Sequence, residues 1–255
     1  MKRVLTAAVL LPIVIYAVLW ANFWIFLAVL VTVAFLCYHE YSGIAASYGF
    51  GTLGVLGYGA GVLLLLWEHD AWLLFSAVAL LSLVMAMRAA DLGCALPRSA
   101  LEVIGILYVF GCWRYALPLR SESPHWLMYA LVLNWAGDIG AYYVGRSLGE
   151  HKLAPRVSPQ KTWEGAAASV VFSILIAGAY LLRFLPGVTL PEAAVLTAAA
   201  NIAGQLGDLA ESAMKRGAHV KDSGTILPGH GGFLDRVDST LFALPVIYAY
   251  LRMGG

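Results

Sequence analysis

The chain has 255 residues, of which 61% are hydrophobic and only 12% are charged. A soluble domain of this length carries about twice that charged fraction, and the mean hydropathy of +0.78 is strongly apolar. The composition excludes an ordinary soluble domain and indicates an integral membrane protein, and we expect no nucleic acid among its partners.

Apolar runs with short connections fill most of the sequence. A spanning helix needs about 20 mainly apolar residues, and such segments lie near residues 4–20, 22–37, 52–67, 71–87, 100–119, 126–145, 163–185, 189–211 and 238–253. Only helices and closed barrels satisfy their backbone in lipid, and these runs are too long for barrel strands. The sequence therefore predicts an all-α, polytopic protein with about nine transmembrane helices. The first run resembles a signal peptide without a clean cleavage site, and we interpret it as an uncleaved span.

Basic residues divide unequally between the two sides that nine crossings would create. With a cytoplasmic N-terminus, twelve Lys and Arg residues fall on the cytoplasmic side, and only Arg114, Arg120, Arg183 and Arg252 lie in or beyond the opposite half. This is the bias that the positive-inside rule describes. We therefore expect an integral membrane protein, of the inner membrane if bacterial, with its polar loops in the cytoplasm.

Residues 1–120 are predicted to form a transmembrane scaffold, and residues 121–255 a catalytic region of the same continuous membrane domain. The stretch GFGTLG at residues 49–54 matches the dinucleotide-binding pattern formally, but no strand precedes it. Further glycines follow at positions 57, 59 and 61, and close helix packing explains them better than nucleotide binding.

His39 and Glu40 lie together at the predicted cytoplasmic boundary of the second apolar run. Polar residues cost little free energy at such a boundary. We interpret both as a solvated helix end, with a supporting role at a functional site as the alternative.

The second half carries polar residues at membrane depth, where they are expensive and usually functional. Asn134, Asp138 and Tyr142 are each four residues apart and share one helical face. A second stripe repeats at steps of four, three, four and three: Asn201, Gln205, Asp208, Ser212 and Lys215. Stripes of this period indicate helices that face a polar cavity, although a hydrogen-bonded network between helices is an alternative for Asp138 and Asp208.

Two charged loops lie beside these stripes. Residues 145–165 combine four cations with a Ser-Pro turn and with Thr162, which could cap the following helix. Taken alone, that loop is explained by the positive-inside bias. Residues 212–239, SAMKRGAHVKDSGTILPGHGGFLDRVDS, concentrate four cations, three aspartates and a glycine-rich tract next to the last apolar run.

The carboxylates near these loops suit a divalent metal ion. Asp208 lies near the cytoplasmic end of its helix, and Asp235 and Asp238 begin the next helix. Such converging carboxylates suit Mg²⁺, which shares its coordination sphere with substrate phosphates. The residues alone do not choose between Asp235 and Asp238.

The neighbouring cations and glycines suit a polyphosphate. Lys161, Lys215, Arg216 and Lys221 supply positive charge. The glycines of the tract can expose backbone N–H donors, and His230 would lie near a helix N-terminus. No nucleophile triad or Walker pattern is found, so this inventory indicates phosphoryl or nucleotidyl transfer at the membrane surface.

Residues 212–238 resemble the signature of the phosphatidate cytidylyltransferases, also called CDP-diacylglycerol synthases. The positions that carry the resemblance are Ser212, Lys215, Arg216, Lys221, Asp222, the run Leu227–Phe233, Asp235, Arg236 and Asp238. The resemblance extends upstream through GQLGDLAES, SPQKTWEG and NWAGDIGAYYVGR, over roughly residues 130–240. Gln160 departs from the family's usual Ser-Pro-Lys-Lys-Thr, which leaves Lys161 as the expected cation of that loop.

The resemblance implies that CTP and phosphatidic acid react to give CDP-diacylglycerol and pyrophosphate, with Mg²⁺ and a second, monovalent cation such as K⁺. It also implies a homodimer. Asp208 and Asp235 would hold the metal beside Asp238, and Lys215, Arg216 and Lys221 would cradle the β- and γ-phosphates. Candidate substrate-binding residues are Asn134, Asp138, Ser158, Lys161, Thr162, Ser212, Arg216, Asp222, His230, Gly231, Gly232 and Arg236. His230 could contact phosphate or hold the glycine tract, and Asp222 could pair with Lys221 or Arg216.

Three alternatives differ in class or substrate. A related CTP-dependent transferase or kinase acting on another lipid would share most of these residues. A transporter should show repeat-related breaks in both halves, whereas the polar features here gather in one half. A non-catalytic scaffold would be expected to lack Asp208, Asp235 or the lysines, and all are present.

Overall fold

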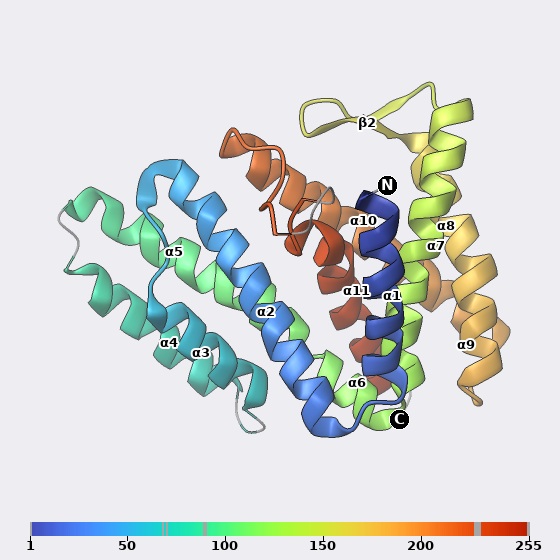
Figure 1. Ribbon diagram of the computed structural model, residues 1–255, viewed down its shortest axis with the longest axis horizontal. Coiled ribbons are helices and arrows are strands. Elements are labelled where there is room, and N and C mark those ends of the chain that lie inside the picture. The colour runs from blue at the N-terminus through green and yellow to red at the C-terminus, as the bar shows by residue number, and fades with distance from the viewer. Residues whose placement is uncertain (1, 68, 70, 89–90, 227–230, 254–255) are drawn as a thin grey trace. The chain divides into compact units, whose positions relative to one another are not determined.

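The computed structural model (Figure 1) describes residues 2–67, 69, 71–88, 91–226 and 231–253. Contacts along the chain group it into two compact units, which are described separately. One consists of Met1–Ala8, Phe23–Arg114 and Met214–Arg236, and the other of Val9–Asn22, Tyr115–Ala213 and Val237–Gly255. We call them the first and second units. The first unit combines residues from both predicted regions, and the division at residue 120 stays a prediction.

Each of the nine predicted apolar segments coincides with helical structure. The α-helices are α1 (Lys2–Leu19), α2 (Phe23–Ala45), α3 (Val55–Leu66), α4 (Ala71–Ala86), α5 (Ala95–Ile106), α6 (Ala116–Glu122), α7 (Pro124–Leu148), α8 (Trp163–Ser173), α9 (Ala179–Phe184), α10 (Leu190–Gly217) and α11 (Leu234–Met253). Short irregular turns extend them: η1 (Ala46–Phe50), η2 (Leu92–Cys94), η3 (Leu107–Gly111) and η4 (Ile174–Gly178). Among the described residues, three continuous helical stretches are long and apolar enough to cross a membrane, namely Phe23–Phe50, Leu92–Glu122 and Trp163–Phe184.

The first unit packs α2, α3 and α5 around buried aromatic rings, with α4 against α5 (Figure 1). Tyr38 and Phe110 are completely buried, and their ring centroids lie 5.4 Å apart. An added Cβ at Gly57 would overlap the Tyr38 ring, and one at Gly61 would overlap the Phe110 ring. Close helix packing is therefore confirmed at these two glycines. At Gly59 an added Cβ would meet no described atom within 4 Å, so packing does not explain that glycine.

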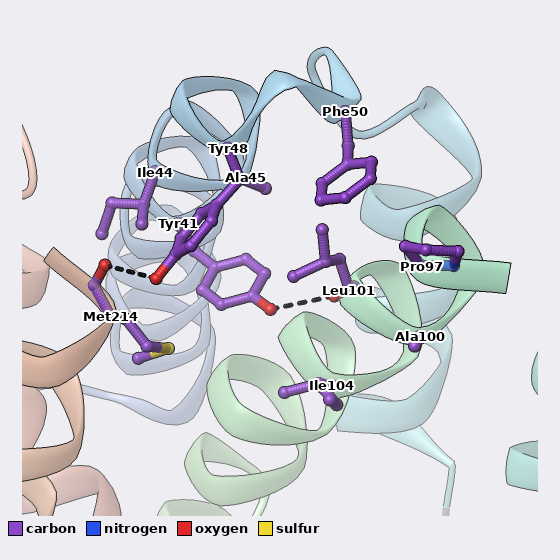
Figure 2. A pocket seen from close by; sticks show the side chains of 10 residues that line it. All are labelled: Tyr41, Ile44, Ala45, Tyr48, Phe50, Pro97, Ala100, Leu101, Ile104 and Met214. Carbon is purple, nitrogen blue, oxygen red and sulfur yellow. Dashed lines mark hydrogen bonds between the residues drawn. The ribbon is translucent and has the colours of Figure 1, made fainter. Parts of the chain in front are cut away.

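An apolar pocket of about 310 Å³ lies between α2, η1 and α5 of the first unit (Figure 2). Two tyrosines of its wall donate hydrogen bonds to backbone carbonyls: Tyr41 Oη to Leu101 O at 3.0 Å, and Tyr48 Oη to Met214 O at 2.9 Å. Tyr48 thereby connects the end of α10 to η1, the turn that follows α2. This contact fixes one end of the charged stretch at residues 212–239.

The second unit contains the long helix α7, which packs most extensively against α8. Ser123 caps α7 and Pro124 occupies its first turn, where a missing N–H costs nothing. Glycines on α7 allow the close approach, because an added Cβ at Gly140 would meet Ala168 O at 2.8 Å. The resulting contact places the end of α7 next to the beginning of α8, on the side predicted to be cytoplasmic.

The all-α fold class is confirmed, but the loop between α7 and α8 contains a short hairpin that the sequence did not predict. Residues Lys152–Ala154 (β1) and Ser158–Thr162 (β2) form an antiparallel hairpin (Figure 1), in which Lys152 pairs with Thr162. Polar residues and Pro159 hid these strands, because strands are normally recognised by alternating apolar side chains. The capping prediction is confirmed, since Thr162 Oγ1 accepts a hydrogen bond from Gly165 N at 3.2 Å at the start of α8.

Candidate active site

A polar cavity of about 760 Å³ lies in the second unit. The hairpin and helices α7, α8 and α10 form its walls. Its lining includes eight residues that the sequence singled out: Asp138, Tyr142, Ser158, Gln160, Lys161, Thr162, Gln205 and Asp208. Arg146, Lys152, Ser169 and Ser239 add further polar side chains. The structure thus brings the 145–165 loop and part of each polar stripe to one cavity.

Lys161 and Asp208 form an ion pair across this cavity. Lys161 lies on β2 and its side chain is 27% exposed, whereas Asp208 lies on α10 with 34% exposure. Ser212, one turn later on α10, donates from Oγ to Asp208 Oδ1 at 3.3 Å. The hairpin therefore places Lys161, the lysine present at positions 160–161, next to Asp208, a predicted metal ligand.

Two further acids lie close to Asp208. Asp238 and Glu211 are buried and share a hydrogen bond, and the charge of Asp208 acts on Asp238. One of these two carboxyls must carry the donated proton, because an ionised carboxylate only accepts. Ser239 N also donates to Asp238 Oδ1 at 2.6 Å. Glu211 was missed by the sequence reasoning, although its position three residues after Asp208 puts it on the same helical face.

Deeper polar residues of the stripes form a network between helices. Asn201 Nδ2 donates to Ser169 Oγ at 3.0 Å and to Ser173 Oγ at 2.9 Å. Gln205 Nε2 donates to Asn201 Oδ1 at 2.7 Å, and Gln205 itself lines the cavity. The stripe on α10 therefore serves two purposes, with helix–helix hydrogen bonds at its deep end and a cavity wall further along.

Asn134 lies in a helix interface. Its side chain is only 8% exposed, and Nδ2 donates to Ala130 O and to Thr240 Oγ1, each at 3.0 Å. Asp138, one turn later on α7, is exposed and lines the cavity. A substrate contact stays a prediction for both residues, and the geometry places only Asp138 at the cavity surface.

Asp235 lies in the first unit at the start of α11, where it is surrounded by donors. Lys215 forms a buried ion pair with it, and the N–H groups of Ser223 and Gly232 donate to Asp235 Oδ2 at 3.0 and 2.8 Å. Burial raises the pKa of Asp235, but these hydrogen bonds and the Lys215 charge outweigh it and hold that pKa below its ordinary value. Gly231 has a φ of +79°, and an added Cβ would meet Asp235 Oδ2 at 2.7 Å, so this turn requires glycine.

The other residues of the charged stretch are more open. The side chains of Arg216, Lys221, Asp222 and Arg236 are exposed, and Arg216 Nη1 donates to Val220 O at 3.1 Å. Lys215 differs from them because it is 7% exposed and engaged with Asp235. His230 lies outside the described residues, and its role stays a prediction.

Glu40 does not belong to a solvated helix end, as the sequence had suggested. Its side chain is 3% exposed, so the solvated interpretation was wrong for this residue. His39 is exposed, and its Nδ1 lies 3.3 Å from Tyr58 Oη. Glu40 is buried because it receives hydrogen bonds from a segment about 190 residues further along the chain.

The donor set near Asp208 fits Mg²⁺ in its chemistry. Within the described ranges, no three His, Cys, Asp or Glu side chains are arranged as a ready metal cage. Mg²⁺ does not need one, because it is usually held by one or two carboxylates, waters and substrate phosphates. The carboxylate of Asp208, open to a polar cavity, is of this kind.

The fold and the cavity define a membrane-embedded protein with a charged, oxygen-rich site. The model of the cytidylyltransferase family matches residues 1–253, and the chain belongs to this family.

Curated relatives carry one name. The phosphatidate cytidylyltransferase of Bacillus subtilis is 42% identical over 153 residues, covering 59% of this chain and 57% of the relative. Those of Staphylococcus saprophyticus and Staphylococcus aureus (strain COL) are each 41% identical, over 149 and 151 residues, covering 58% of this chain and 57% of each relative. The matched part thus spans little more than half the length of these relatives.

Proposed function

We propose that this chain transfers a cytidylyl group from CTP to phosphatidic acid, giving CDP-diacylglycerol and pyrophosphate for phospholipid biosynthesis. Membership of the cytidylyltransferase family and the name shared by its relatives support this proposal. The observation that carries it is the cavity in which Lys161 and Asp208 meet. A nucleoside triphosphate needs both cationic and metal-binding groups, and this cavity offers both.

The reaction needs no strong general base. The phosphate monoester of phosphatidic acid is already an anion, and one of its oxygens forms a bond to the α-phosphorus of CTP. The bond from that phosphorus to the bridging oxygen of the β-phosphate breaks, and pyrophosphate leaves with the electron pair. Catalysis then rests on positioning and charge neutralisation.

The cations of the cavity would bring the two polyanions together. Lys161, Lys152 and Arg146 line it, and each would reduce the repulsion between the lipid phosphate and the triphosphate. The exposed Arg216 and Lys221 of the charged stretch are proposed to contact the β- and γ-phosphates.

Mg²⁺ is the proposed cofactor, with Asp208 and Asp235 as its carboxylates and Asp238 as their neighbour; a second, monovalent cation is part of the proposal. When bound, Mg²⁺ would neutralise phosphate charge and act as a Lewis acid. Asp208 already opens to the cavity, whereas Asp235 is held by Lys215 and two backbone N–H groups. To bind a metal, Asp235 would release Lys215 from Oδ1 while Oδ2 keeps its two backbone N–H donors.

We further propose that the protein has nine spans, a cytoplasmic N-terminus and a cytoplasmic active site, and that it forms a homodimer. The charge bias supports this orientation, and the coincidence of all nine predicted segments with helices supports the number of spans. CTP is water-soluble and the acyl chains stay in lipid, so a site at the cytoplasmic interface would serve both substrates.

Labelled CTP tests the reaction class directly. Purified protein in lipid nanodiscs is given Mg²⁺, CTP labelled at the α- or the γ-phosphate, and phosphatidic acid, diacylglycerol or a long-chain lipid alcohol. Cytidylyl transfer puts the α-label, and not the γ-label, into the lipid fraction with phosphatidic acid only. The γ-label in lipid would indicate a kinase, and α-label in another lipid would indicate a related transferase; either result would contradict the proposal.

A further inference from the structure

Glu40 connects α2 to the beginning of α11 within the first unit. Its Oε2 accepts hydrogen bonds from Leu234 N at 2.8 Å and from Ser223 Oγ at 3.0 Å. Its Oε1 accepts a third hydrogen bond, from Phe233 N at 3.0 Å. One buried carboxylate thus gathers three donors from the charged stretch.

Two of these donors are the N–H groups at the start of a helix. The first N–H groups of any helix lack partners within that helix, and a negative charge there is stabilised by the helix dipole. Helix α11 begins at Leu234, so Glu40 caps it from another helix. Asp235 is the next residue, and its side-chain direction depends on how this first turn is oriented.

Ser223 extends the connection to Asp235 itself. Its hydroxyl donates to Glu40 and accepts from Asp235 N at 3.4 Å, while its own N–H donates to Asp235 Oδ2 at 3.0 Å. Glu40 and Asp235 therefore hold the same serine from two sides. Neither carboxylate can move without disturbing a hydrogen bond of the other.

Two glycines of the charged stretch pack closely against Glu40. An added Cβ at Gly224 would meet Glu40 Oε1 at 2.6 Å, and one at Gly232 would overlap both Glu40 and Ser223. The other end of the stretch is held by Tyr48, which donates to Met214 O (Figure 2). Helix α2 and its extension η1 thus contact described residues near both ends of the stretch.

We propose that Glu40 is a positioning residue for the reaction: it orients the first turn of α11 and the Ser223 link so that Asp235 presents its carboxylate to the metal–nucleotide complex. This inference rests on the proposed function for the role of Asp235, and on the observed hydrogen bonds for the role of Glu40. It also gives the N-terminal half of the chain a part in the active site beyond that of a scaffold.

Glu40→Gln tests the proposal, because glutamine keeps the size of the side chain but cannot accept from all three donors. Glu102→Gln is the matched control: Glu102 is also a buried glutamate of the first unit, 8% exposed, and accepts from Ser82 Oγ at 2.8 Å. Wild type and both variants are compared in nanodiscs for Mg²⁺ dependence of pyrophosphate release, for melting temperature, and for amide hydrogen exchange.

The expected result is specific to Glu40. Removing a residue that orients a metal ligand typically costs about tenfold or more in metal affinity or activity, so Glu40→Gln should raise the half-saturating Mg²⁺ concentration or lower kcat by about that factor. Exchange of the Phe233 and Leu234 amides, which donate to Glu40, should accelerate about tenfold or more, as expected for a lost charged hydrogen bond. Glu102→Gln should leave all of these unchanged.

The proposal is overturned if Glu40→Gln retains wild-type Mg²⁺ dependence, kcat and amide protection, or if both variants lose activity in proportion to their melting temperatures. Should Glu40→Gln give no folded protein, Ser223→Ala decides in the same way, because it removes only the hydroxyl between Glu40 and Asp235. If wild type fails to turn over CTP and phosphatidic acid, the proposed function fails. The amide exchange of Phe233 and Leu234 still decides whether Glu40 holds this turn.

Discussion

Lys161→Gln should raise the KM for CTP far more than Arg156→Gln, which removes another cation of the hairpin. Lys161 lines the cavity and pairs with Asp208, whereas Arg156 lies on the same hairpin segment, is exposed and is absent from the cavity lining. Both substitutions remove one positive charge from one short loop. The difference between them therefore isolates position from overall charge.

The size of the effect follows from the exposure of the pair. A hydrogen bond to a charged group contributes about 1.5–3 kcal/mol, which corresponds to roughly 10- to 150-fold in an equilibrium constant. Lys161 and Asp208 are 27% and 34% exposed, so water and salt screen their charges in part. We therefore expect the lower end: a rise in KM for CTP of about tenfold for Lys161→Gln, and less than about twofold for Arg156→Gln.

The assay is pyrophosphate release against CTP concentration at saturating phosphatidic acid and Mg²⁺. Melting temperatures of the two variants show whether the hairpin remains folded. Equal KM values for Lys161→Gln and Arg156→Gln, or a wild-type KM for Lys161→Gln, would refute the reasoning that links the cavity to the triphosphate.

Three other predictions come from single contacts. Gly61→Ala should lower stability by about 1–3 kcal/mol because its Cβ would overlap the Phe110 ring. Gly59→Ala has open space around its Cβ and should be neutral or stabilise the protein by up to about 1 kcal/mol. Equal thermal stability of the two variants in nanodiscs would contradict this packing. Thr162→Ala should cost about 1 kcal/mol by removing the α8 cap, and Thr162→Ser should recover most of it in the same measurement. Gln160→Lys adds a cation to the cavity wall and should lower the KM for CTP with a steeper dependence on salt; a KM that is unchanged at low and high salt would show that position 160 does not face the triphosphate.

Much of the fold follows from patterns that are local in the sequence. Apolar runs are long enough to identify each helix segment, and the positions of Gly57 and Gly61 were correctly attributed to packing because small residues allow helices to approach. The same logic failed at Gly59, where the structure offers open space. A glycine pattern predicts that helices can pack closely, but it does not say which face is used.

The cavity was partly predictable because helical periodicity is local. Steps of three and four placed Gln205 and Asp208 on one face, and the structure finds both in the cavity wall. The ion pair of Asp208 with Lys161 was not predicted. It joins residues 47 positions apart, and it depends on a hairpin whose side chains are mostly polar. Its strands carry no apolar alternation, which is the signal that sequence reasoning depends on.

Glu40 could not be assigned from sequence because its partners are remote. A glutamate at a helix end is expected to be solvated unless other residues bury it. The three donors to Glu40 lie between 183 and 194 residues away in the sequence. Only the folded chain shows that backbone N–H groups of α11 replace water around its carboxylate.

The most direct measurement combines purified wild-type protein and Asp235→Asn with CTP, phosphatidic acid and Mg²⁺ in nanodiscs, and follows pyrophosphate and the lipid product by mass spectrometry. Wild type should release one pyrophosphate for each CDP-diacylglycerol formed. Asp235→Asn, which keeps the size of the side chain and removes its charge, should lose at least about a hundredfold in rate, as expected for the loss of a carboxylate that binds the metal or its substrate. A wild type that forms no CDP-diacylglycerol, or an Asp235→Asn variant as active as wild type, would contradict the proposed reaction and the role of its carboxylates.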